Sequence, residues 1–157
     1  MNAPLKITPT PVKKTITVQA SQRRAFEVFT SRVGTWWPKS HHIAKVEMAN
    51  VFIEPRQGGR WYERGVDGSE CDWGKVLAWE PPGRVVLSWH LNSKFALDEA
   101  VDSAVDVRFI AENAHTTRVE LEHRITAADA EAIRAQVDSP GGWGGLLAAF
   151  AAAANGG

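Results

Sequence analysis

A small set of side chains in this sequence has the chemistry to act as acid or base. His123 follows Val119 and Leu121 in the alternating stretch TTRVELEHR, so a strand there turns all three to the same face. An inward imidazole can bind a ligand or transfer a proton near neutral pH, or it can be a core histidine paired with the backbone. Glu63, in RWYERG, is either a buried carboxyl group in the same cavity or a surface residue, because the register of this short strand is open. Tyr62 is the third candidate for a catalytic role.

The sequence does not indicate a metal site, a catalytic cysteine or a nucleotide-binding motif. His41 and His42 are adjacent, so their side chains point apart on an extended segment, and no Cys or carboxylate follows at ligand spacing. We therefore expect a solvated loop there and no metal site. Cys71 has no His and Asn pattern that would make it a nucleophile. Gly58-Gly59 and Gly141-Gly142 fit a turn and a helix start, not a phosphate-binding motif, so no cofactor is expected.

Tryptophan is unusually frequent, with seven residues in a chain of 157. Indoles of this size belong to a core or to the wall of a cavity. Trp36 and Trp37 lie in a predicted loop before Pro38, where they either gate a cavity mouth or form a lid that packs and never moves.

The remaining tryptophans fall mainly in predicted strands. We expect Trp89 and one of Trp61 and Trp73 to face the cavity, while a plain core role is the alternative for each. Trp79 has the same strand parity as Trp73 unless a bulge at Gly74 shifts the register.

Hydrophobic periodicity predicts the elements that position these residues. Residues 13–20 alternate as a strand, and Ser21 caps a helix that Gly34 ends. Thr126 and Asp129 form a capping-box-like start of a short helix through Val137. The other predicted strands are 46–56, 60–65, 71–80, 84–91, 104–111 and 116–124, with a polar loop around 92–103. Their short connections predict an antiparallel meander.

Alternation gives this meander one apolar face. An antiparallel sheet of that length must curl, and its apolar face needs a cover. The residues predicted to share this face are Val85, Leu87, Trp89, Leu91, Val105, Val107, Phe109, Val119, Leu121 and His123.

The stretch SPGGWGGLLAAFAAAAN is the natural cover for the sheet. It reads as one helix with Ser139 as N-cap, Pro140 at the first helical position and an end before Asn155. Apart from one side it is almost bare Ala and Gly, and a slim helix under a curved sheet leaves a cavity between them. The predicted ligand-binding residues are Trp36, Trp37, Trp61, Trp89, His123, Trp143, Leu147 and Phe150.

Composition limits the class of protein. Lys plus Arg and Asp plus Glu both number 18, so no excess charge attracts nucleic acid or an anionic membrane. The single cysteine excludes an internal disulfide and fits a reducing cytoplasm. No signal peptide or membrane span is evident, so we expect a cytoplasmic protein. Residues 1–11 are expected to be loosely ordered and residues 12–157 to form a single domain.

The chain resembles the START-like (SRPBCC) helix-grip superfamily, and within it the bacterial homologues of the activator of the 90-kDa heat-shock chaperone ATPase. The likeness covers roughly residues 12–154 and lies in TITVQASQRRAFEVFT, Trp36-Trp37-Pro38, IEPRQGGRWYE, GKVLAWEPPGRVVLSW and TTRVELEHR with the terminal helix. It implies an α+β fold in which a curved antiparallel sheet of about six to seven strands surrounds a long C-terminal helix, with short helices after the first strand. In relatives the cavity between sheet and helix holds hydrophobic or aromatic small molecules.

Three functions are compatible with these patterns. The leading hypothesis is binding of a small hydrophobic or aromatic molecule between the sheet and the C-terminal helix. The first alternative is an enzyme of the cyclase or dehydratase kind, which needs His123 with Glu63 or Tyr62 close to the substrate. The second is a stress-linked co-chaperone that binds a chaperone partner. The related eukaryotic co-chaperone has an additional N-terminal domain where this chain has about eleven residues, which disfavours chaperone stimulation.

Overall fold

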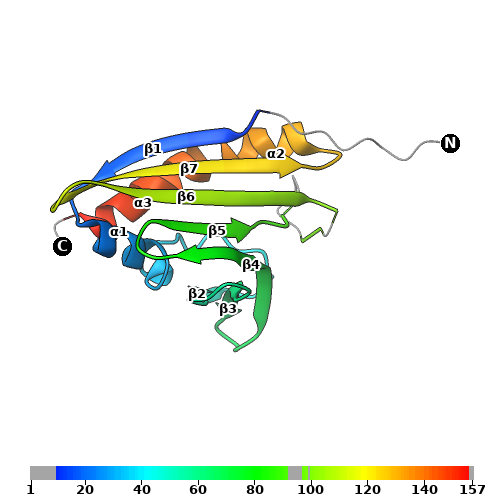
Figure 1. Cartoon of the computed structure of the whole chain (residues 1–157). Helices are drawn as coiled ribbons and strands as arrows, with labels where there is room; N and C mark the ends of the chain where they lie inside the picture. The colour runs from blue at the N-terminus through cyan, green and yellow to red at the C-terminus, as the bar shows by residue number, and fades with distance from the viewer. Residues whose placement is uncertain (1–9, 92–96, 99, 156–157) are drawn as a thin grey trace.

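A curved sheet of seven antiparallel strands forms the frame of the molecule, in the order β1-β7-β6-β5-β4-β3-β2 (Figure 1). The computed structural model describes residues 10–91, 97–98 and 100–155. The strands are β1 Val12–Val18, β2 Met48–Ile53, β3 Arg60–Gly65, β4 Glu70–Glu80, β5 Arg84–Ser88, β6 Asp102–Asn113 and β7 Thr116–Thr126. The predicted meander is confirmed, whereas residues 1–9 of the expected N-terminal segment and 92–96 and 99 of the expected loop lie outside the described residues.

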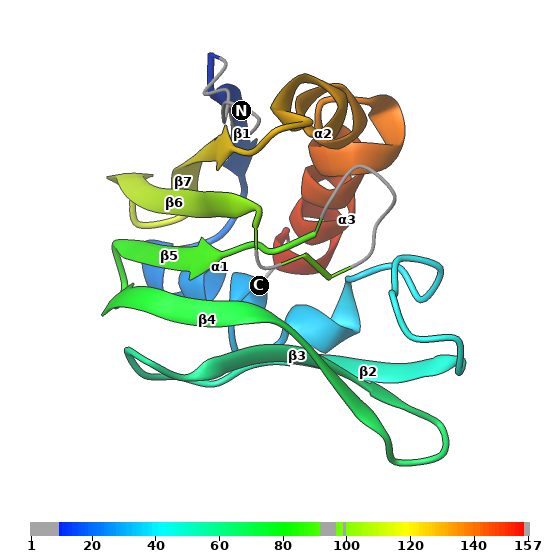
Figure 2. The same ribbon diagram turned by 90° about the vertical axis from the view of Figure 1, so that its right-hand side faces the viewer.

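Helical elements cover the inner side of this sheet. They are α1 Gln22–Phe29, the short turn η1 Val33–Thr35, α2 Ala130–Val137, the turn η2 Pro140–Gly144 and α3 Gly145–Ala154. Figure 2 shows α3 within the curve of the sheet, so the α+β helix-grip architecture expected from the sequence is confirmed. No helix in the described ranges has the length and apolar character needed to cross a membrane.

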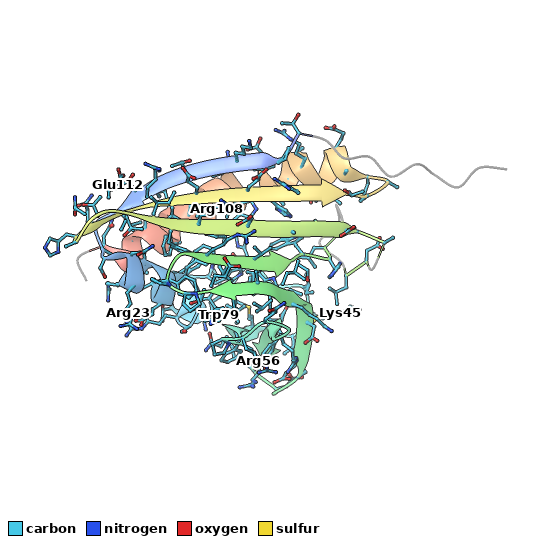
Figure 3. All side chains as sticks on the ribbon, viewed as in Figure 1. Arg23, Lys45, Arg56, Trp79, Arg108 and Glu112 are labelled. Atoms are coloured by element: carbon cyan, nitrogen blue, oxygen red, sulfur yellow. The ribbon has the colours of Figure 1, made fainter. Side chains whose placement is uncertain are left out.

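Alternation along the strands separates an apolar inner face from a charged outer face. Val105, Val107 and Phe109 of β6 are buried, as predicted. Between them Asp106 faces outward, where its carboxylate accepts hydrogen bonds from Arg84 at 3.0 and 3.1 Å. Figure 3 shows charged side chains, among them Arg108, over this outer face. The inner face therefore belongs to the core.

Two register shifts in β4 determine where its two tryptophans lie. Trp61 pairs with Gly74 and Tyr62 with Asp72, so Trp73 is the extra residue. A Cβ on Gly74 would lie 2.1 Å from the carbonyl oxygen of Ser88, so only glycine allows this close approach. Trp73 is fully buried toward the inner face. A second register shift in β4 lies between Val76 and Ala78, and Trp79 beyond it is half-buried against the ring of Phe26.

The helix α1 is shorter than expected. Ser21 caps it as predicted, since its hydroxyl accepts a hydrogen bond from the Arg24 amide at 3.2 Å. The helix ends at Phe29, however, and Val33 belongs to the separate turn η1. The Thr30 hydroxyl donates to the Phe26 carbonyl at 2.7 Å, an alternative to a further helical turn at this end.

The predicted C-terminal helix is interrupted in its first turn. Its helical path starts after Ser139, but Gly142 has φ −93° and ψ −132°, outside the helical region. A Cβ on Gly142 would lie 2.3 Å from the carbonyl oxygen of Val137, so the bend depends on glycine. The Ser139 hydroxyl donates to the Gln136 carbonyl at 2.6 Å and does not cap the turn. The predicted start of the preceding helix was also misplaced, because its N-cap is Asp129.

The end of α3 is fixed to the N-terminal part of the chain. The Arg24 guanidinium donates to the carbonyl oxygens of Ala154 at 3.0 Å and Ala153 at 3.2 Å. The backbone amide of Gln19 donates to the side-chain oxygen of Asn155 at 2.8 Å. The Arg24 contacts satisfy two carbonyl groups of the helix end, and together with the Gln19 contact they fix α3 at this end of the sheet.

Candidate functional site

A pocket of about 340 Å³ lies at the opposite end of the helical layer, beside the α2–α3 junction. Its walls come from the loop after η1, from β4, from the residues that follow β5, and from the end of α2, the bent segment and the start of α3. In Figure 2 this loop, in cyan, faces the α2–α3 segment, in orange. The lining residues are Trp37, Ser40, His41, His42, Ile43, Trp73, Trp89, Leu91, Gln136, Val137, Ser139, Gly141, Gly142, Trp143 and Leu146.

Four indole rings line this pocket, those of Trp37, Trp73, Trp89 and Trp143. Trp37 contacts Trp73 with ring centroids 5.2 Å apart, and Trp89 contacts Trp143 at 5.6 Å. The edge of Trp143 also meets Trp37 at 6.4 Å. Each of these indoles comes from a different segment of the chain, so the aromatic wall exists only in the folded protein. Tilted and edge-to-face contacts of this kind hold the rings in fixed orientations.

The Trp143 indole is held in place by a hydrogen-bonded chain behind the pocket. Its Nε1 donates to His123 Nδ1 at 3.0 Å. Nδ1 is therefore the acceptor nitrogen, so Nε2 carries the hydrogen and donates to the Ser103 hydroxyl at 3.3 Å. The Ser103 hydroxyl in turn donates to the Trp89 carbonyl. The chain thus links the Trp143 indole to the backbone of Trp89 through a histidine that is itself 0% exposed.

The environment of His123 keeps its imidazole neutral. Burial lowers the pKa of His123 from 6.5 to about 3, because a charged ring there would lose its hydration. Both ring nitrogens already have partners, and the residue does not line the pocket. In this arrangement His123 positions Trp143.

Glu63 is also fully buried, immediately behind the pocket wall. Its Oε1 accepts hydrogen bonds from the Ile43 amide at 2.7 Å and from Trp73 Nε1 at 2.9 Å, with the Ala44 amide at 3.3 Å. Its Oε2 has no hydrogen-bond partner among the described residues. Of the buried side-chain nitrogen and oxygen atoms in these residues, only Trp61 Nε1 also has none. An unpaired buried carboxyl oxygen is costly, so it marks this position for functional interpretation.

Tyr62 lies on the opposite face of β3. Its ring stacks on Phe52 at 5.2 Å, and the Arg60 guanidinium lies 3.9 Å from the ring centroid. Neighbouring strand residues point to opposite faces, so Tyr62 and Glu63 cannot converge. The structure therefore does not bring His123, Glu63 and Tyr62 together in one site.

The predicted ligand-binding residues divide between the pocket and the core behind it. Trp37, Trp89 and Trp143 line the pocket. Trp36 instead donates its indole hydrogen to the Val28 carbonyl at 2.8 Å. The other predicted residues are buried without lining the pocket: Trp61, His123, Leu147 and Phe150.

His41 and His42 were expected in a solvated loop, yet both are partly buried in the pocket wall. His41 Nε2 donates to the Gly141 carbonyl at 2.9 Å, and its Nδ1 lies 3.2 Å from the Ser40 hydroxyl. This contact joins the loop to the bent segment before α3. The only sequence signal for the placement is the position of the pair directly after the aromatic loop. No group of three or more His, Cys, Asp or Glu within the described ranges could hold a metal ion.

The curved sheet, the inner helix and the aromatic pocket define a helix-grip protein of the SRPBCC type. Residues 19–155 match the model of the family "Activator of Hsp90 ATPase homolog 1-like protein", and the chain belongs to this family. No protein of curated function matches it.

Several solved structures are similar to this one. The anthrahydroquino-gamma-pyrone synthase Txn09 is 36% identical, with a TM-score of 0.61 over 92% of this chain and 97% of the synthase. CalC from Micromonospora echinospora, a self-sacrificing resistance protein, is 28% identical, with a TM-score of 0.63 over 92% of this chain and 93% of CalC. PFC0360w, an HSP90 activator from Plasmodium falciparum, is 20% identical, with a TM-score of 0.52 over 73% and 72% of the two chains, and shows the fold alone.

Proposed function

We propose that this protein binds a planar aromatic small molecule in the pocket beside the α2–α3 junction. The observation that carries the proposal is the indole wall made by Trp37, Trp73, Trp89 and Trp143. Flat aromatic ligands stack on such rings and displace water from apolar surface. The volume of about 340 Å³ lies within the range of small-molecule sites, roughly 300–1,000 Å³.

The pocket also has a small number of polar groups, as do most sites that orient an apolar ligand. They include Ser40, Gln136 and Ser139 together with the two histidines. The likeness to Txn09 supports the same ligand class, because the name of that enzyme denotes a fused aromatic product that carries oxygen atoms. It also favours a second candidate function, an enzyme that acts on such a molecule.

Titration of the intrinsic tryptophan fluorescence with anthraquinone tests the proposal. Binding against the indole wall should quench the emission in a saturable way, with one ligand per chain. The variant Gly141→Leu should weaken binding about tenfold, because Gly141 lines the pocket and a side chain there would occupy ligand space.

The matched control is Gly144→Leu. Gly144 lies in the same turn, is exposed and does not line the pocket, so this variant should bind as the natural protein does. Absence of saturable quenching, or equal weakening by both variants, would contradict binding at this pocket.

A further inference from the structure

We propose that His42 and Glu63 form a proton-accepting pair at the polar end of this pocket, and that the pair selects aromatic ligands with an acidic hydroxyl group, a phenol or an enol. The inference rests on the proposed binding function and assigns chemistry to residues outside the indole wall. It starts from the two side chains whose hydrogen-bonding capacity is left open at the pocket.

The hydrogen bonds of His42 determine which ring nitrogen is available. Its Nδ1 lies 2.7 Å from the Ala44 carbonyl oxygen. A carbonyl oxygen only accepts, so Nδ1 carries the hydrogen and Nε2 of the neutral ring has the free lone pair. Within the described part of the chain Nε2 has no hydrogen-bond partner, and His42 lines the pocket. A ligand hydroxyl group can therefore donate to it.

Glu63 stands behind the same imidazole. Its Oε2, the oxygen with no hydrogen-bond partner, lies 3.9 Å from His42 Nδ1. Its Oε1 is fixed by the amides of Ile43 and Ala44, the two residues that follow His42. The loop that carries the histidine is thus tied to the carboxyl group that faces it. The buried carboxyl group and the imidazole are therefore held as a fixed pair at the pocket.

Other titratable groups of this region do not compete for the role. Both ring nitrogens of His41 have partners, the Gly141 carbonyl and the Ser40 hydroxyl. Cys71 pairs with Glu63 across β3 and β4, and burial together with the negative charges of Glu63 and Asp72 raises the pKa of its thiol. The thiol therefore stays protonated, and Lys45 is exposed on the surface (Figure 3).

The transfer itself involves only a proton. The ligand O–H bond breaks, the proton moves to His42 Nε2, and the bonding electrons remain on the oxygen as a phenolate or enolate. His42 becomes an imidazolium whose Nδ1–H stays on the Ala44 carbonyl, with Glu63 Oε2 as counter-charge. No oxidant, reductant or further reactant is required.

A pair of probes that differ by one hydroxyl group tests the inference on the intact protein. We expect 2-hydroxyanthraquinone to bind about tenfold more tightly than anthraquinone, because a hydrogen bond to a group that becomes charged is among the stronger ones. The visible absorbance of the bound phenol should convert to that of the phenolate about one pH unit lower than in free solution.

Two variants separate this pair from the rest of the site. His42→Phe and Glu63→Gln should both abolish the shift in phenolate formation, and His42→Phe should also remove the preference for the hydroxylated probe. Because His42 lines the pocket, its role is judged from the ratio of the two probe affinities within each variant. The matched control His115→Phe, in the turn between β6 and β7, should keep both the preference and the shift.

The outcomes distinguish aromatic binding at the pocket from the role of His42 and Glu63. Equal binding of both probes to the natural protein, or a preference that survives in His42→Phe, overturns the role of His42 and Glu63 while aromatic binding stands. Absence of binding by either probe overturns the proposed function together with this inference. Loss of the shift in both His42→Phe and Glu63→Gln, with loss of the preference in His42→Phe and neither loss in His115→Phe, supports the pair.

Discussion

Single residues of the pocket wall are oriented by contacts that lie outside the pocket. Trp143 is one such residue, since its indole nitrogen donates to His123 in the interior of the sheet. The alternation of β7 predicted that His123 faces inward, and the structure places it there. Its hydrogen-bond partners come from β6 and from the turn before α3, so no local sequence pattern could identify them.

The depressed pKa of His123 makes a prediction about acid stability. The folded protein binds this proton only near pH 3, whereas the unfolded chain binds it near 6.5. The contribution of His123 to the free energy of unfolding is therefore at its full value above pH 6.5. It falls as the pH is lowered toward 3, by up to about 1.4 kcal/mol per pH unit, because the unfolded chain takes up the proton and the folded protein does not. Urea unfolding of the natural protein and of His123→Gln across this range should show a shallower pH slope for the variant.

Carboxylates also titrate between pH 3 and 6.5, so a surface histidine variant is needed to isolate the contribution of His123 to the pH slope. His115→Gln, in an exposed turn, should keep the slope of the natural protein. Parallel slopes for the natural protein and His123→Gln would show that the imidazole is not held neutral in the folded state.

At the scale of elements, the bent segment Pro140–Gly144 shapes the pocket. The sequence predicted one continuous helix here, because Pro140 after Ser139 and the apolar repeat that follows are both typical of a helix. The bend at Gly142 depends on a close approach to the Val137 carbonyl in another helix, which a local pattern does not contain. The strands were predicted more accurately, since their period of two repeats along β6 and β7.

The two glycines of this segment should respond differently to alanine. Gly142→Ala should destabilise the protein by about 1–3 kcal/mol, because the new methyl group would overlap the Val137 carbonyl. Gly144 has helical angles and open space around it, so Gly144→Ala should stabilise by about 0.4–1 kcal/mol. Denaturant unfolding of both variants provides the check, and similar effects at the two positions would be inconsistent with the bend.

Loop placement was the least predictable part of the candidate site. His41 contacts Gly141, 100 residues further along the chain, and so reaches the pocket through a long-range contact. The sequence suggested two isolated histidines with no partner at ligand spacing. The register of β3 was likewise open, and the bulge opposite Trp61 and Tyr62 became visible only with the paired strands in place.

At the scale of the whole molecule, the fold joins two aromatic regions. Near the end of α3, Phe150 packs against Phe29 and Trp36 and fills the space under the sheet. Toward the α2–α3 junction the indoles line a space of about 340 Å³. Aromatic side chains thus pack the space near the end of α3, while the pocket lies toward the α2–α3 junction, and this asymmetry is the reason that we expect a ligand at that end.

The indole N–H resonances of the seven tryptophans provide the most direct test of this account. In a two-dimensional ¹H–¹⁵N spectrum each indole gives one signal, and assignment by single Trp→Phe variants identifies it. On addition of anthraquinone, the signals of Trp37, Trp73, Trp89 and Trp143 should shift, while those of Trp36 and Trp79, outside the pocket wall, should stay in place. Shifts confined to Trp36 and Trp79, or a spectrum unchanged at saturating ligand, would contradict aromatic binding at this site.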